Sequence, residues 1–126
     1  MQDQLFEYAV IRIMPKVERE EFMNVGVIVY CSKQKFLQAM YHSNTDRLEA
    51  FCKETDVQEI HNNLDAMDRI CKGASSSGPI ARLDIAARFR WLTATRSTVV
   101  QTSKVHPGLC KHPDETLLKL YNKLVL

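Results

Sequence analysis

The sequence has 126 residues, of which 45% are hydrophobic, 25% charged and 8% aromatic. This length suits a single domain spanning 1–126, and the composition is that of an ordinary globular protein rather than a disordered, fibrous or membrane chain. Lys and Arg number 17 against 15 Asp and Glu, so the net charge of +2 is too small to indicate a nucleic-acid or membrane partner.

The first third of the chain predicts three β-strands. Residues 6–14 and 22–31 combine β-branched and aromatic residues with alternating side-chain patterns, and a third segment, 36–42, follows a short polar link. Pro15 ends the first strand, and the charged run after it predicts a solvated turn. Successive strands with short connections are typical of an antiparallel meander.

From Asn44 onwards the hydrophobic period changes to that of helices. Asn44 or Thr45 can cap a short first helix, and the spacing of apolar residues over 57–71 predicts a second, amphipathic one. Gly73 supplies its stop signal, and the small and polar residues of 73–79 predict a flexible surface loop.

The last third predicts a helix over 84–92, capped by its first residue, a strand over 97–105, a turn at Pro107-Gly108 and a final helix over 113–125. The expected order is therefore three strands, three helices, one strand and one helix. This order indicates an α+β domain in which an antiparallel sheet has its helices packed on one face.

Cysteine spacing and the N-terminal sequence bear on the environment of the protein. The four cysteines form no C-x-x-C pair, which argues against a zinc or thioredoxin-type site, and they are expected to be reduced and mostly buried. No secretory signal is visible, and the longest apolar run, 25–31, is far shorter than the roughly 20 residues that span a bilayer. We expect a cytoplasmic protein without metal or cofactor.

Residues able to bind an anion concentrate in the segment 88–110. Its Arg-Ser-Thr sequence, at a predicted loop-to-strand junction, can hold an anion because a guanidinium offers two parallel donors and the hydroxyl and backbone N–H groups complete the cradle. Residues of the first hairpin join this group if the two strands are neighbours. The expected binding residues are Arg12, Asn24, Arg90, Trp91, Arg96, Ser97, Thr98 and His106.

Structural interpretations of several of these residues stay open. Arg88 and Arg90 can flank a helix on its solvated side, and Arg96 can pair with a surface acid. Trp91 can be a core or rim aromatic residue. Asn24, close to a glycine, can mark a bulge in the second strand.

An enzyme is the main alternative to a binding module. Phosphoryl- or acyl-handling chemistry would use Arg96, Ser97, His106 and Cys110, the last two as base and nucleophile. No third orienting group accompanies them, and no P-loop, dinucleotide fingerprint, nucleophile elbow or zinc-protease motif occurs in the sequence. These absences favour a non-catalytic role.

Two segments resemble one known family: YAVIRIMPKVEREEFMNVGVIVYC at 8–31 and RFRWLTATRSTVVQTSKVHPGLC at 88–110. The family is the bacterial domain of unknown function 3037 (DUF3037), and the similarity covers nearly the whole chain. Thr95 stands where family members often carry proline. The resemblance implies a small single-domain bacterial protein with no established activity, cofactor or catalytic residue. Some members are encoded beside HipA-like kinases, so it also implies such a kinase as a partner.

We therefore expect a small α+β domain that acts as a non-catalytic binding or accessory module through an Arg-rich polar surface. Its partner would be an acidic protein surface or a phosphate-bearing ligand. Nucleic acid is disfavoured because DNA-binding proteins usually carry a strongly basic field, and no membrane association is expected.

Overall fold

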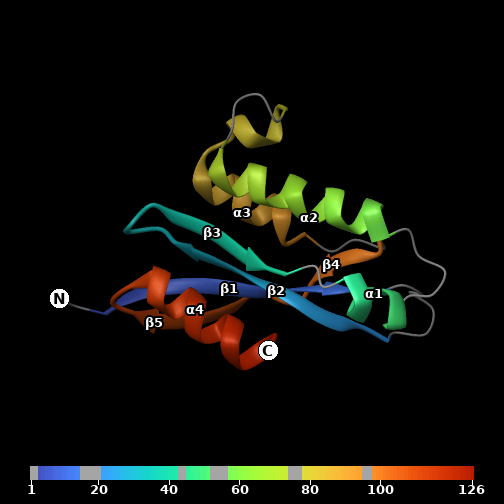
Figure 1. The fold of residues 1–126 in the computed structure, drawn as a ribbon. Helices are drawn as coiled ribbons and strands as arrows, with labels where there is room; N and C mark the ends of the chain where they lie inside the picture. The colour runs from blue at the N-terminus through green and yellow to red at the C-terminus, as the bar shows by residue number, and fades with distance from the viewer. Residues whose placement is uncertain (1–2, 15–20, 43–44, 52–56, 74–77, 95–97) are drawn as a thin grey trace.

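The fold is seen in a computed structural model, which describes residues 3–14, 21–42, 45–51, 57–73, 78–94 and 98–126. Figure 1 shows a sheet with α2 and α3 along one side and α4 along the other. The elements are β1 (Gln4–Ile13), β2 (Met23–Cys31), β3 (Phe36–Tyr41), α1 (Thr45–Phe51), α2 (Val57–Lys72), the 3-10 turn η3 (Ile80–Arg82), α3 (Ile85–Leu92), β4 (Val100–Thr102), β5 (His106–Cys110) and α4 (Pro113–Leu124).

The sheet is antiparallel and has the order β3-β2-β1, with β4 and β5 sharing the remaining edge of β1. Between these two short strands, Ser103 keeps the chain attached to Val10. Its N–H donates to the Val10 carbonyl at 2.8 Å, and its hydroxyl accepts from the Val10 N–H at 2.9 Å. The predicted α+β class, with its antiparallel sheet, is confirmed.

The predicted strand over 97–105 and the predicted turn at Pro107-Gly108 are both corrected. The chain forms two short strands instead, and the Pro-Gly pair lies inside β5, opposite Glu7 and Phe6. Proline is tolerated there because an outer strand does not need every N–H for the ladder. Glycine is required because a Cβ on Gly108 would lie 2.5 Å from the Phe6 ring.

The helices cover both faces of the sheet, which corrects the expectation of a single covered face. Ala9, Ile11 and Ile13 of β1 belong to the core beneath α2 and α3, whereas Val27 and Val29 of β2 belong to a second core beneath α4. The physical reason lies in β2, whose residues 25–31 are all buried. A strand that is apolar on both sides needs cover on both sides.

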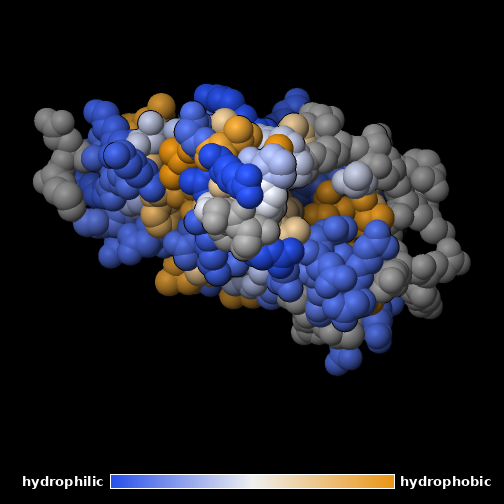
Figure 2. Space-filling model, turned by 90° about the horizontal axis from the view of Figure 1, so that it is seen from above, coloured by the Kyte–Doolittle hydropathy of each residue, from blue (hydrophilic) through white to orange (hydrophobic). Residues whose placement is uncertain are grey.

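The four predicted helices are present as α1, α2, α3 and α4. Asp84 caps α3 as expected, because its side chain accepts from the Ala87 N–H at 2.8 Å. The predicted cap at Asn44 and the centre of the predicted loop, 74–77, lie outside the described residues. Within the described chain, no helix combines the length and apolar character needed to cross a membrane. Seen from the side of α2, the surface is mainly hydrophilic, with hydrophobic residues in separate areas (Figure 2).

The close packing of Gly108 against Phe6 makes a prediction about stability. We expect Gly108→Ala to lower the free energy of unfolding by about 1–3 kcal/mol, because the new methyl group must displace a buried ring. Urea denaturation followed by circular dichroism measures the change. Leu109→Ala, at the exposed neighbouring position, is the control and should change stability by no more than about 0.5 kcal/mol.

Candidate functional site

Arg12 belongs to β1, which has β2 on one side and β4 on the other. It lies directly opposite Asn24 of β2 and Gln101 of β4. Its neighbours along β1, Ile11 and Ile13, point into the core beneath α2, so Arg12 points to the opposite face. There the Arg12 Cζ atom lies 4.0 Å from the centre of the Phe22 ring, a cation–π contact. We call Arg12, Phe22, Asn24 and Gln101 the Arg12 surface.

The guanidinium of Arg12 has no anionic partner among the described residues. Its Nε is buried and has no hydrogen-bond partner. Burial lowers the pKa of Arg12 from its ordinary value, although an arginine still keeps its charge at neutral pH. A cation partly removed from water without a compensating anion costs free energy, so the position is suited to receive an anion from outside.

Asn24 connects this surface to the C-terminal helix. Its side-chain amide donates to the carbonyl of Leu124, in the last turn of α4, at 3.1 Å, while its Oδ1 is buried without a partner. The register shifts here, so that Gly26 lies opposite Ile11 and Asn24 opposite Arg12. This irregularity confirms the predicted bulge and sets the Asn24 side chain beside Arg12.

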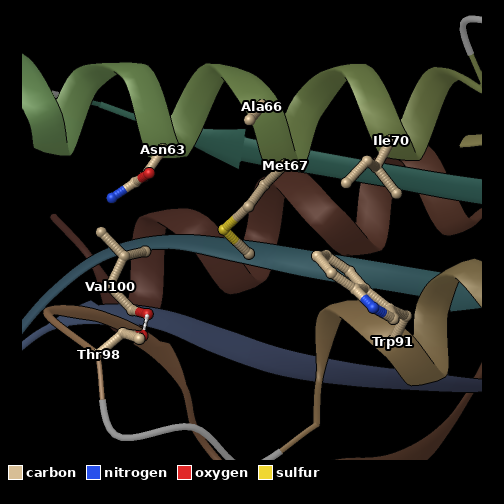
Figure 3. Close-up of a pocket in the computed structure, with 7 residues that line it drawn as sticks. All are labelled: Asn63, Ala66, Met67, Ile70, Trp91, Thr98 and Val100. Carbon is tan, nitrogen blue, oxygen red and sulfur yellow. Dashed lines mark hydrogen bonds between the residues drawn. The ribbon is translucent and has the colours of Figure 1, made fainter. Parts of the chain in front are cut away.

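A second candidate region is a cavity of about 210 Å³ between α2 and the segment that contains α3 and β4 (Figure 3). Its volume is below the ~300–1,000 Å³ of a typical metabolite site and suits a single apolar group. The Thr98 hydroxyl donates to the Val100 carbonyl at 2.7 Å and is thereby engaged within its own segment. The lining residues are Asn63, Ala66, Met67, Ile70, Trp91, Thr98 and Val100.

The expected binding residues therefore fall into separate groups. The structure brings Arg12 beside Asn24, and it places Trp91 and Thr98 together in the cavity against α2. The other described residues of the set lie elsewhere, and two lie outside the described part of the chain. Arg90 is exposed on α3, His106 begins β5 with its ring 5.3 Å from that of Tyr8, and Arg96 and Ser97 are the two that are not described.

Phe22 is a member of the Arg12 surface that sequence reasoning missed. The side chain is 45% exposed and holds the guanidinium over its ring. A signal was present in the sequence, because Phe22 lies two residues before Asn24 and residues two apart in extended chain share a face. The bulge after Asn24 changes the alternation along the rest of β2, so the pattern from Gly26 onwards does not show on which face Phe22 and Asn24 lie.

Arg88, which belongs to the same Arg-rich segment, has a structural role. Its Nη1 donates to the carbonyls of Ile70 and Cys71 at 2.9 and 3.0 Å, where the last turn of α2 leaves carbonyl groups without helical partners. Gly73 follows with φ of 68°, and a Cβ there would lie 2.6 Å from the same nitrogen. Arg88 and Gly73 thus end α2 together.

The geometry of β5 separates the candidate base His106 from the candidate nucleophile Cys110. Four residues of extended strand span about 13 Å, and the ring of Phe6 lies against Gly108 between them. Burial raises the pKa of Cys110 above its ordinary value and raises that of Cys71 to about 12. The described residues contain no cluster of His, Cys, Asp and Glu that could hold a metal ion.

The fold defines the class of protein: a small α+β protein whose antiparallel sheet has α1, α2 and α3 on one face and α4 on the other. Within that class, the chain belongs to the family described as "Protein of unknown function (DUF3037)", whose model matches residues 8–125. The resemblance carried by 8–31 and 88–110 is confirmed. No curated protein and no solved structure matches the chain significantly.

Arg88 and Arg90 both belong to α3, but only Arg88 contacts the end of α2, so the pair allows a test of its helix-ending role. We expect Arg88→Met to lower the free energy of unfolding by about 1–3 kcal/mol, because two carbonyls at the end of α2 lose their charged donor. Arg90→Met is the matched control, and its exposed side chain should change stability by no more than about 0.5 kcal/mol. Equal losses in chemical denaturation would contradict the helix-ending role.

The raised thiol pKa values predict slow alkylation. At about pH 8, an unperturbed thiol is partly ionised, whereas Cys71 and Cys110 should remain thiols and react with iodoacetamide far more slowly than a cysteine in an unfolded peptide. Mass spectrometry of tryptic peptides over a pH series measures each rate. Rapid labelling of Cys110 at neutral pH would restore it as a candidate nucleophile.

Proposed function

We propose that the chain is a non-catalytic binding module and that its Arg12 surface takes up a carboxylate group of an acidic partner protein. One observation carries this proposal: Arg12 is a partly buried cation whose Nε has no hydrogen-bond partner and whose guanidinium has no anion among the described residues. Folding alone gains little from such an arrangement, because a cation loses hydration there without forming an ion pair.

The donors on this surface favour a carboxylate over a phosphate group. The amide of Asn24 already donates to Leu124, and that of Gln101 donates to the Thr98 carbonyl at 2.6 Å. Each amide keeps a second N–H, but among the described residues of the surface the guanidinium supplies the charged donors. One planar fork with a single positive charge matches a carboxylate, whereas phosphate sites usually add further cations or a row of backbone N–H groups.

The surroundings of Arg12 favour a protein as the carrier of that carboxylate. Phe22 is exposed beside the guanidinium, and the pair offers an apolar ring and a charged fork on an outer surface rather than in a deep pocket. Arginine and aromatic residues are enriched among the residues that dominate protein–protein binding energies. A HipA-like kinase, which the family resemblance suggests, is the first natural partner to examine.

Arg12→Met tests the proposal with two measurements. The first is binding of a fluorescein-labelled hexaglutamate peptide, followed by fluorescence anisotropy at low salt. We expect Arg12→Met to weaken binding at least about tenfold, and Arg12→Lys to give an intermediate loss because it keeps the charge without the planar fork. Arg90→Met, which removes an exposed arginine from α3, should change the affinity by less than about twofold.

The second measurement is stability in the absence of peptide. Methionine keeps an apolar stem against Phe22 and removes the buried charge, so Arg12→Met should leave the free energy of unfolding unchanged or raise it by about 1 kcal/mol. A fall of more than about 2 kcal/mol, together with unchanged peptide binding, would show that Arg12 is a structural residue.

A further inference from the structure

β5 forms an outer edge of the sheet, and its main-chain groups divide into an inner and an outer set. Along the edge of β1 that faces β4 and β5, the even-numbered residues of β1 make the main-chain hydrogen bonds, as those of Val10 and Met14 show. In the pairing with β5, the even-numbered residues of β1, Gln4, Phe6 and Tyr8, lie opposite Cys110, Gly108 and His106, so residues 107 and 109 direct their main-chain groups outwards. Pro107 has only a carbonyl to offer, whereas Leu109 offers both N–H and C=O.

Two leucines lie exposed beside this edge. Leu5 and Leu109 are directly opposite each other on β1 and β5, and they are 58% and 68% exposed. Residues directly opposite in an antiparallel pair have neighbouring side chains on one face. Neither leucine belongs to the cores that α2, α3 and α4 cover. The fold thus leaves an apolar pair next to main-chain donors and acceptors to which no other described strand is paired.

The segment that forms this edge is basic. Residues 103–112 contain no acid, and Lys104, His106, Lys111 and His112 are all exposed. Neither lysine forms a salt bridge with another described residue. Nearby described acids lie on β1, where Glu7 is opposite Pro107 and Asp3 is near Cys110, and in the first turn of α4, where Asp114 and Glu115 follow Lys111. An incoming acidic side chain is therefore favoured most near Lys104, which has no acid among its neighbours in sequence, less strongly near Lys111, and is disfavoured beside Pro107.

A second copy of the chain is a poor occupant of this edge. An antiparallel pairing of two β5 strands about Gly108 would bring Lys104 of one copy near His112 of the other, so positive charges would meet. Pro107 would also remove one N–H donor from each copy.

We propose that the β5 edge binds an extended segment of a partner protein, which adds to the sheet as a further strand. An apolar residue of that segment packs on Leu5 and Leu109, and acidic residues near its ends meet Lys104 and Lys111. The main-chain groups of Leu109 provide hydrogen bonds, and the alternate side chains provide selectivity. The site is distinct from the Arg12 surface, since the seven residues from Leu5 to Arg12 span about 23 Å of strand.

Two labelled nonapeptides test this inference. In both peptides threonine alternates with other residues, and a leucine and a valine lie at the centre. The first peptide has a glutamate near each end, and the second has a lysine at the same two positions. Fluorescence anisotropy should show that the glutamate peptide binds at least about tenfold more tightly than the lysine peptide. Leu109→Gln and Lys111→Glu should each weaken its binding about tenfold. Leu118→Gln, at a half-exposed leucine on α4, is the matched control and should not weaken it.

Amide hydrogen exchange locates the peptide. Binding should slow exchange of the Leu109 N–H and leave the Phe22 region unchanged, and Arg12→Met should keep the affinity for the glutamate peptide within about twofold. Equal affinity for both peptides, or no protection at Leu109, would overturn the proposal. A concentration-dependent dimer with a protected Leu109 N–H would overturn it in favour of self-association. Loss of binding in Arg12→Met but not in Leu109→Gln would assign the peptide to the Arg12 surface instead.

Discussion

The burial of β2 on both faces is the constraint on which the rest of the structure depends. Residues 25–31 are all buried, and they contribute alternately to the core beneath α2 and α3 and to the core beneath α4. Two layers of helices are needed to keep this strand from water. α4 packs mainly over β2 and β3. The edge of β1 that does not pair with β2 pairs instead with the short strands β4 and β5. The Arg12 surface and the β5 edge both lie along this side.

Hydrophobic periodicity was sufficient to predict the types and approximate places of most elements. A period of two marks β1 and β3, and a period of 3.6 marks α2 and α4, because these elements each bury a regular set of side chains. The same pattern does not say which layer covers which face. The apolar run in β2 contained that information, since a half-solvated strand would carry polar residues at alternate positions.

Features that depend on contacts across the chain could not be predicted in the same way. Pro107-Gly108 has the composition of a turn, and its place in β5 depends on the Phe6 ring opposite Gly108, about a hundred residues earlier. The division of the expected binding residues into an Arg12 surface and a cavity beside Trp91 likewise depends on which sheet face each element covers. Local propensity carries no information on either point.

Arg12 and Arg88 show why residue type alone does not identify a binding site. Both are arginines in polar stretches of the family motifs, and both have a buried Nε without a partner. Arg88, however, has its Nη1 engaged by two helix carbonyls, whereas the guanidinium of Arg12 contacts an aromatic ring and has no hydrogen bond to another described residue. Hydrogen bonds made within the fold stabilise the folded chain whether or not a ligand is present. A half-buried charge without such bonds gains most when something outside the chain supplies them. The difference between the two arginines is therefore a difference in where each finds its hydrogen-bond acceptors.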